Sequence, residues 1–128
     1  MTLFSRILAA IAGLMGAAGV AAAAMAAHAA ADPRLATASM FLMIHAAAGM
    51  GLVALTQSVQ RPRAILIPAA ILLLGAALFG GDITLRVLAE LRPVPMAAPA
   101  GGLLMIAGWL LGAVGAIMCI ETKSKAKP

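Results

Sequence analysis

The chain has 128 residues, of which 64% are hydrophobic and only 10% are charged, and its formal net charge is +5. A soluble domain has about 25% charged residues, so this composition excludes an ordinary water-soluble protein and indicates a chain surrounded mostly by lipid. The basic residues lie singly in polar segments without interleaved aromatic residues, which argues against a nucleic-acid-binding protein. The sole cysteine, Cys119, excludes a disulfide within the chain.

Four apolar stretches cover almost the whole chain, and each is long enough to cross a bilayer. They run over residues 4–30, 35–59, 64–91 and 98–120, and a basic tail follows over residues 121–128. A transmembrane helix needs roughly 20 apolar residues, and backbone polar groups in lipid must pair within the protein. The stretches therefore predict an all-α fold, a single domain in which four transmembrane helices form a bundle.

Short proline-containing segments separate the four stretches, at residues 32–34, 60–63 and 92–95. Proline is tolerated at the start of a helix and disrupts its interior, so these segments predict helix boundaries. For the same reason, we expect Pro68 and Pro99 in the first turns of the third and fourth helices.

The distribution of Lys and Arg predicts the orientation in the membrane. One side of the bilayer would carry Arg6, Arg61, Arg63, Lys123, Lys125 and Lys127, and the other side only Arg34 and Arg92. Cytoplasmic connections carry the excess of basic residues, so both termini are expected in the cytoplasm, and the protein in a bacterial inner membrane.

The first stretch also has an alternative interpretation as a secretory signal. Arg6, the apolar run after it and the alanines at residues 29–31 resemble a signal peptide with its cleavage site, and cleavage would leave three spans. The apolar run is longer than the 7–15 residues typical of a signal core, which favours a retained helix.

Small residues recur at four-residue spacing in the first and fourth helices. They are Ala9, Gly13 and Ala17 in the first helix, and Gly108, Gly112 and Ala116 in the fourth. Small side chains let helix backbones approach closely, so both rows are predicted packing surfaces. A chain rich in alanine and glycine also produces this spacing by chance, and the rows could pack within the chain or against a partner.

Four ionisable residues lie within the predicted spans: His28, His45, Asp82 and Arg86. Asp82 and Arg86 are four residues apart, so they share one helix face and can pair. With a rise of about 1.5 Å per residue, His45 and Asp82 fall at a similar depth, roughly 13–15 Å inside the outer boundary. His28 and Arg86 lie closer to that boundary. We therefore expect one polar cluster in the outer half of the bundle.

This cluster admits a functional and a structural interpretation. It would serve as a proton or ion relay or bind a lipid headgroup, or it would be a satisfied hydrogen-bond network that fixes the helix register. The second is favoured because no chain of acids and bases crosses the span. Two histidines without further ligands do not indicate a metal site, and no cofactor is expected. Trp109 lies near mid-membrane, where core packing is expected.

Several segments resemble a known family, domain-of-unknown-function family 423. Residues 16–28 are similar to its Gly-Ala-Phe-Gly-Ala-His segment, and residues 44–47 to its His-Ala-Leu-Ala segment. Residues 78–82 resemble its Leu-Phe-Ser-Gly segment. Residues 98–102 followed by 107–109 resemble its Thr-Pro-x-Gly-Gly and Ala-Gly-Trp stretch, the most specific of these matches. The segments follow in the family's order and cover most of the chain.

The sequence departs from that family at Gly80, where Ser is common, and at Ala98, where Thr is common. The resemblance implies a small bacterial inner-membrane protein with four helices, and it supplies no activity. The short connections and the absence of nucleophile, phosphate-binding or zinc-protease motifs favour a non-enzymatic protein. It would act in the bilayer by helix packing, as an accessory subunit of a larger membrane complex or a homo-oligomer. The alternative is a small transporter or channel that uses His28, His45, Asp82 and Arg86.

Overall fold

The computed structural model describes residues 1–29, 32–92 and 94–125, with residues 120–125 described by their backbone alone. Within these ranges the chain is all-helical: α1 (Leu3–His28), α2 (Pro33–Leu55), the short 3₁₀ helix η1 (Thr56–Ser58), α3 (Arg63–Leu88) and α4 (Ala97–Lys125). Four helical segments are long and apolar enough to cross a membrane. The chain is therefore an all-α protein with four candidate membrane spans.

The helix ends differ from the predicted ones by a few residues. Asp32 caps α2 by accepting the Arg34 backbone N–H at 2.9 Å, and Pro33 occupies the first turn, so α2 begins before residue 35. α4 continues through Lys125 into the expected tail. Glu121 and Lys125 are four residues apart, a spacing that favours a helix. Residue 30, the predicted end of the first helix, and residues 126–128 lie outside the described ranges.

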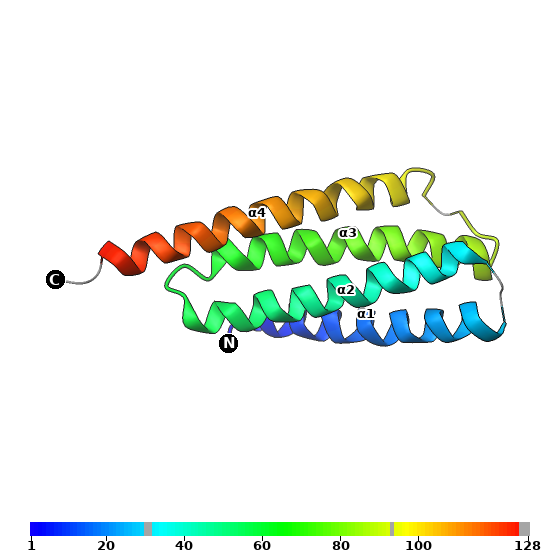
Figure 1. The fold of residues 1–128 in the computed structure, drawn as a ribbon, viewed down its shortest axis with the longest axis horizontal. Coiled ribbons are helices and arrows are strands. Elements are labelled where there is room, and N and C mark those ends of the chain that lie inside the picture. The colour runs from blue at the N-terminus through cyan, green and yellow to red at the C-terminus, as the bar shows by residue number, and fades with distance from the viewer. Residues whose placement is uncertain (30–31, 93, 126–128) are drawn as a thin grey trace.

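The helices run up and down along one long axis, and the two ends of the chain lie at the same end of the molecule (Figure 1). α1, α2 and α3 pack together, whereas the backbone of α4 approaches only α3 within the described part of the chain. The buried share of the span is 50% in α3 and 17% in α4, so α3 is the central helix and α4 is peripheral. The structure is thus a three-helix group with a fourth helix on one side, rather than a symmetric bundle.

The core lies where α1, α2 and α3 meet. Its most buried members are Leu72, Ala69 and Ala76 of α3, with Leu42 and Val53 of α2 against them. α1 contributes Leu8, Ala12 and Met15, and α4 contributes Met105. Large apolar side chains on the outer faces of α1 and α4 remain exposed, which carries no hydrophobic penalty when the surrounding solvent is lipid.

Glycines allow α3 and α4 to approach backbone to backbone. A Cβ atom at Gly101 would lie 2.6 Å from the Gly75 carbonyl oxygen, and one at Gly108 would lie 2.9 Å from the Leu72 Cα. Farther along α4, a Cβ at Gly112 would lie at an ordinary 3.8 Å from the Pro68 Cβ. Because packing replaces the hydrophobic effect between helices in lipid, this close contact is what holds α4 to the protein.

Pro68 lies inside α3, beyond the first turn where we expected it, because Pro62 caps the helix and Arg63 is its first residue. A proline ring leaves the carbonyl four residues earlier without its helical donor, here the carbonyl of Ala64. Gly115 of α4 packs directly against that Ala64 carbonyl. The absence of a side chain at Gly115 thus lets α4 cover the turn that Pro68 interrupts. Pro99 does lie in the first turn of α4.

The cap of α2 gives a testable pH dependence. The Arg34 side chain donates to Asp32 at 2.7 Å from its Nη2 atom, and the Arg34 backbone N–H donates as well; these bonds hold the pKa of Asp32 below its ordinary value of 3.8. Because the folded-state pKa is lowered, the stabilisation by the carboxylate is present above the unfolded-state pKa and is lost as the pH falls through the folded one. We expect an NMR titration midpoint below 3.8 for Asp32, moving up toward 3.8 in Arg34→Gln; an unshifted wild-type midpoint would contradict this.

Candidate functional site

His45 is the most fully hydrogen-bonded of the predicted site residues. It is buried on α2, and its Nδ1 lies 2.7 Å from the Phe41 carbonyl oxygen, while the Trp109 Nε1 lies 3.3 Å from its Nε2. A carbonyl oxygen only accepts and an indole N–H only donates, so Nδ1 carries the proton and Nε2 accepts. This pair of bonds requires the neutral imidazole and occupies both ring nitrogens.

The imidazole also belongs to a row of rings that joins three helices. Phe41 stacks on His45 with ring centroids 5.6 Å apart, and it contacts Phe79 of α3 at 4.8 Å. The Trp109 ring meets His45 edge-on at 6.1 Å. Trp109 was expected in the core, but it is 49% exposed. Its indole N–H explains the position, because it reaches from the peripheral helix α4 to the His45 Nε2 on α2.

The His45–Trp109 bond predicts a measurable coupling between α2 and α4. We expect His45→Phe and Trp109→Phe each to lower the free energy of unfolding, and the double variant to lose less than the sum, with a coupling energy of about 0.6–1.5 kcal/mol. Both substitutions keep an aromatic ring and remove the nitrogen atoms of the bond. A double-mutant cycle subtracts the other effects of each single change, such as the smaller ring that replaces Trp109 and the lost contact with the Phe41 carbonyl. The check is a double-mutant cycle from unfolding in mixed micelles followed by circular dichroism, and strictly additive losses would contradict the bond.

Asp82 and Arg86 form the second polar group, on one face of α3. The Arg86 Nη2 lies 2.5 Å from the Asp82 Oδ2, with the Asp82 side chain 1% exposed and that of Arg86 28% exposed. Both Asp82 carboxylate oxygens and the Arg86 Nε are buried without a hydrogen-bond partner. Polar atoms in this state are uncommon in folded proteins. The pair is electrically balanced but not fully satisfied.

A small pocket lies beside this carboxylate, at the end of the α3–α4 contact. Its volume is about 170 Å³, and Asp82 is its one ionisable lining residue. The rest of the lining is apolar and comes from α3, the segment before α4 and the first residue of α4: Ala77, Leu78, Gly81, Leu85, Val94 and Ala97. The carboxylate thus borders a cavity whose other walls offer it no side-chain donor.

The four predicted polar residues fall into separate bonded groups. His45 is bonded to Phe41 and Trp109, Asp82 is paired with Arg86, and His28 is exposed at the last turn of α1. Over the described ranges, no hydrogen bond or ion pair joins these groups to one another. No set of three or more His, Cys, Asp and Glu side chains in the described part of the chain is arranged to hold a metal ion.

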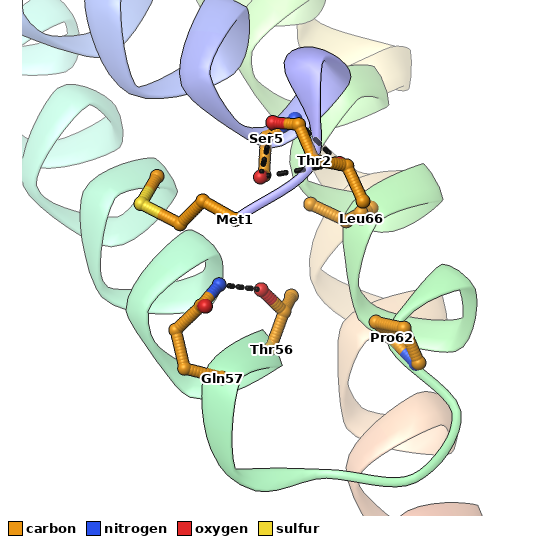
Figure 2. A pocket seen from close by; sticks show the side chains of 7 residues that line it. All are labelled: Met1, Thr2, Ser5, Thr56, Gln57, Pro62 and Leu66. Atoms are coloured by element: carbon orange, nitrogen blue, oxygen red, sulfur yellow. Dashed lines mark hydrogen bonds between the residues drawn. The ribbon is translucent and has the colours of Figure 1, made fainter.

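A larger pocket of about 320 Å³ lies at the opposite end of the molecule, between the start of α1 and the α2–α3 connection (Figure 2). Its polar side chains are already bonded to the protein. Ser5 Oγ donates to the Thr2 carbonyl at 2.8 Å, Thr56 Oγ1 donates to the Val53 carbonyl at 2.6 Å, and Gln57 Nε2 donates to Thr56 Oγ1 at 3.0 Å. The polar side chains of the lining thus bond to one another and to the backbone, and the sequence analysis did not predict this pocket.

The predicted packing residues also separate by position. Gly108 and Gly112 face α3 and are buried, and Ala116 is half-buried. Gly13 and Ala17 lie on the outer face of α1, and a Cβ at Gly13 would meet nothing within 4 Å. The row on α4 therefore packs within the chain, whereas the row on α1 divides: Ala9 packs against the core, and Gly13 and Ala17 face outward.

A family model described as "Protein of unknown function (DUF423)" matches residues 15–102, which is more than half of the chain. The chain belongs to the DUF423 family. No curated protein and no solved structure matches it. His28, His45, Asp82 and Arg86 all lie inside the matched range, as does Gly101, whereas Gly108 and Trp109 lie beyond it. Sequence analysis of this DUF423 protein did not predict the His45–Trp109 hydrogen bond, because the two residues lie 64 positions apart in the chain.

Proposed function

We propose that this DUF423 protein is a multi-pass protein of the bacterial inner membrane with both termini in the cytoplasm. The four apolar helices support the membrane assignment. The orientation is supported by Arg6 in the first turn of α1 and by Arg61 and Arg63 at the α2–α3 connection. The start of α1 and this connection lie at the same end of the molecule (Figure 1). Cytoplasmic connections of membrane proteins carry such a basic excess.

Within the membrane, the proposed role is non-enzymatic: the protein acts by packing its helices against another membrane protein, as an accessory subunit. The observation that carries this proposal is the outer face of α1, where Gly13 and Ala17 are exposed and no helix in the described part of the chain covers them. Small residues on a lipid-facing surface allow close approach of a second helix, which gains van der Waals contact that lipid tails do not supply as well.

A matched pair of substitutions tests this role. We expect Ala17→Leu to abolish co-purification of the partner in mild detergent, because leucine would hold the second helix away from the Gly13–Ala17 row. Ala18→Leu makes the same change one residue later, on another exposed side of α1, and should leave the assembly intact. Equal behaviour of the two variants, or a lone chain in every preparation, would contradict the proposal.

A second candidate function is transport, favoured by the buried Asp82–Arg86 pair and the cavity beside it. Ionisable residues inside a membrane often mark ion or substrate pathways. An ion or substrate flux in proteoliposomes that Asp82→Asn abolishes and Asp32→Asn preserves would support transport. Asp32 is the matched control because it forms an exposed ion pair of the same type. A flux that both variants retain would rule Asp82 out as part of the pathway.

A further inference from the structure

The Asp82 pocket combines an unmet hydrogen-bonding capacity with open space next to it. The Oδ2 atom of Asp82 contacts the Arg86 Nη2 at 2.5 Å, whereas its Oδ1 has no hydrogen-bond donor although the side chain is only 1% exposed. An ionised carboxylate accepts up to about four hydrogen bonds, so the contact with Arg86 leaves most of its capacity unused. The neighbouring cavity of about 170 Å³ has room for several water-sized groups.

The charges select the kind of ligand that fits. A buried carboxylate needs one positive charge nearby, and Arg86 supplies it at 2.5 Å. An additional cation would raise the local charge to a net positive value, whereas an anion would be repelled by Asp82. A cation that replaces Arg86 beside Asp82 keeps the buried site neutral. This replacement avoids both the excess positive charge and the repulsion of an anion.

The position of Arg86 allows its side chain to move away from Asp82. Its side chain is 28% exposed, its Nε has no acceptor, and it lies in the last turn of α3, near the membrane boundary. A long arginine side chain at a helix end can extend to the aqueous interface while its methylene groups stay on apolar surface. The guanidinium can thus be hydrated at the boundary once another cation pairs with Asp82.

We propose that the Asp82 pocket binds a primary ammonium group, which replaces Arg86 as the partner of the carboxylate. An ammonium has three N–H donors for the two free carboxylate oxygens, and the apolar walls formed by Leu78, Leu85 and Val94 suit a short hydrocarbon stem. The ammonium comes from the headgroup of an aminophospholipid or from a free small amine. This site stands independently of the proposed partner assembly on α1.

The test is calorimetric titration of the full chain in detergent with ethylammonium chloride. The control titrant is tetramethylammonium chloride, which has no N–H donor, at equal ionic strength. We expect saturable binding of ethylammonium only. Arg86→Gln removes the internal competitor and should bind at least about tenfold more tightly, because its carboxylate is otherwise uncompensated. Asp82→Asn and the double variant Asp82→Asn/Arg86→Gln should not bind, and Asp32→Asn should match the wild type.

A second measurement needs no variant: ethylammonium should raise the unfolding midpoint of the wild-type protein, and tetramethylammonium should not. Native mass spectrometry distinguishes the sources, since an aminophospholipid retained by the wild type and lost in Asp82→Asn identifies the lipid, and its absence identifies a free amine. Absence of saturable ethylammonium binding in both the wild type and Arg86→Gln, or unchanged binding in the double variant, would overturn the proposal.

Discussion

Gly101→Leu is expected to detach α4 from α3 and to lower the free energy of unfolding by at least about 3 kcal/mol. The Cβ atom alone would lie 2.6 Å from both the Gly75 carbonyl oxygen and the Phe79 backbone nitrogen, so no rotamer of leucine avoids the α3 backbone. Trp109 is the only tryptophan of the chain and lies on α4, so its fluorescence during unfolding in mixed micelles reports the loss of docking.

The adjacent glycine supplies the control. A Cβ at Gly102 would meet nothing within 4 Å, so Gly102→Leu should change the unfolding free energy by less than about 1 kcal/mol, with helix propensity gained rather than lost. The two variants have the same composition and differ only in which side of α4 carries the leucine. Similar losses in both would contradict the close α3–α4 contact.

Asp82→Ala is expected to be the most damaging substitution of a polar residue, with a loss of about 3 kcal/mol in unfolding free energy. It leaves the partly buried Arg86 guanidinium without its counter-charge, and Arg86 is only 28% exposed. The partial exposure allows some rehydration, which places the expected loss at the lower end of the range for broken buried pairs. The measurement is again unfolding in mixed micelles.

Two further variants separate charge from packing. Asp82→Leu/Arg86→Leu removes both charges and should recover most of the loss, because apolar replacements of a buried pair are often neutral or stabilising. Asp32→Asn removes the charge from an exposed pair of the same residue types, where Arg34 is 66% exposed, keeps a side chain that can cap α2, and should have little effect. A loss in the double variant as large as in Asp82→Ala would show that the pair acts through packing rather than charge.

The sequence was sufficient to predict the helices because lipid imposes a strong constraint on them. So few charges and four long apolar stretches predict four membrane helices, and the structure has four helices that are long and apolar enough to cross a membrane. Helices end before Pro33 and before Pro62, as expected, because proline disrupts a helix at its own position in the chain. Pro68 was predicted in the first turn of the third helix, but that helix begins earlier, at Arg63, after the Pro62 cap. The start of a helix depends on all residues of its first turn, so a single proline does not determine it.

The arrangement of the helices was less predictable. α4 has outward-facing side chains as apolar as those of α3, such as Leu103 and Leu110, so hydropathy alone does not reveal that α4 packs on one side only. The glycine spacing does not distinguish Gly108, which lies against α3, from Gly13, where an added Cβ would meet nothing within 4 Å.

The candidate site was predicted in part. The i,i+4 spacing identified the Asp82–Arg86 pair because a helix brings such residues together without tertiary information. The His45 partner was not found, because a hydrogen bond from Trp109 depends on how α4 leans across α3. Depth alone placed His45 and Asp82 in one layer, and the single polar cluster stays a prediction, with no hydrogen bond or ion pair joining these two residues in the described part of the chain.

The most direct test of helix packing as the function is native mass analysis of the tagged protein after gentle extraction at its native expression level. We expect a complex that contains this chain and a second membrane protein, retained in Ala18→Leu and lost in Ala17→Leu. A lone chain or a homo-oligomer that is unaffected by Ala17→Leu would contradict the accessory role and leave the Asp82 pocket as the functional centre of the protein.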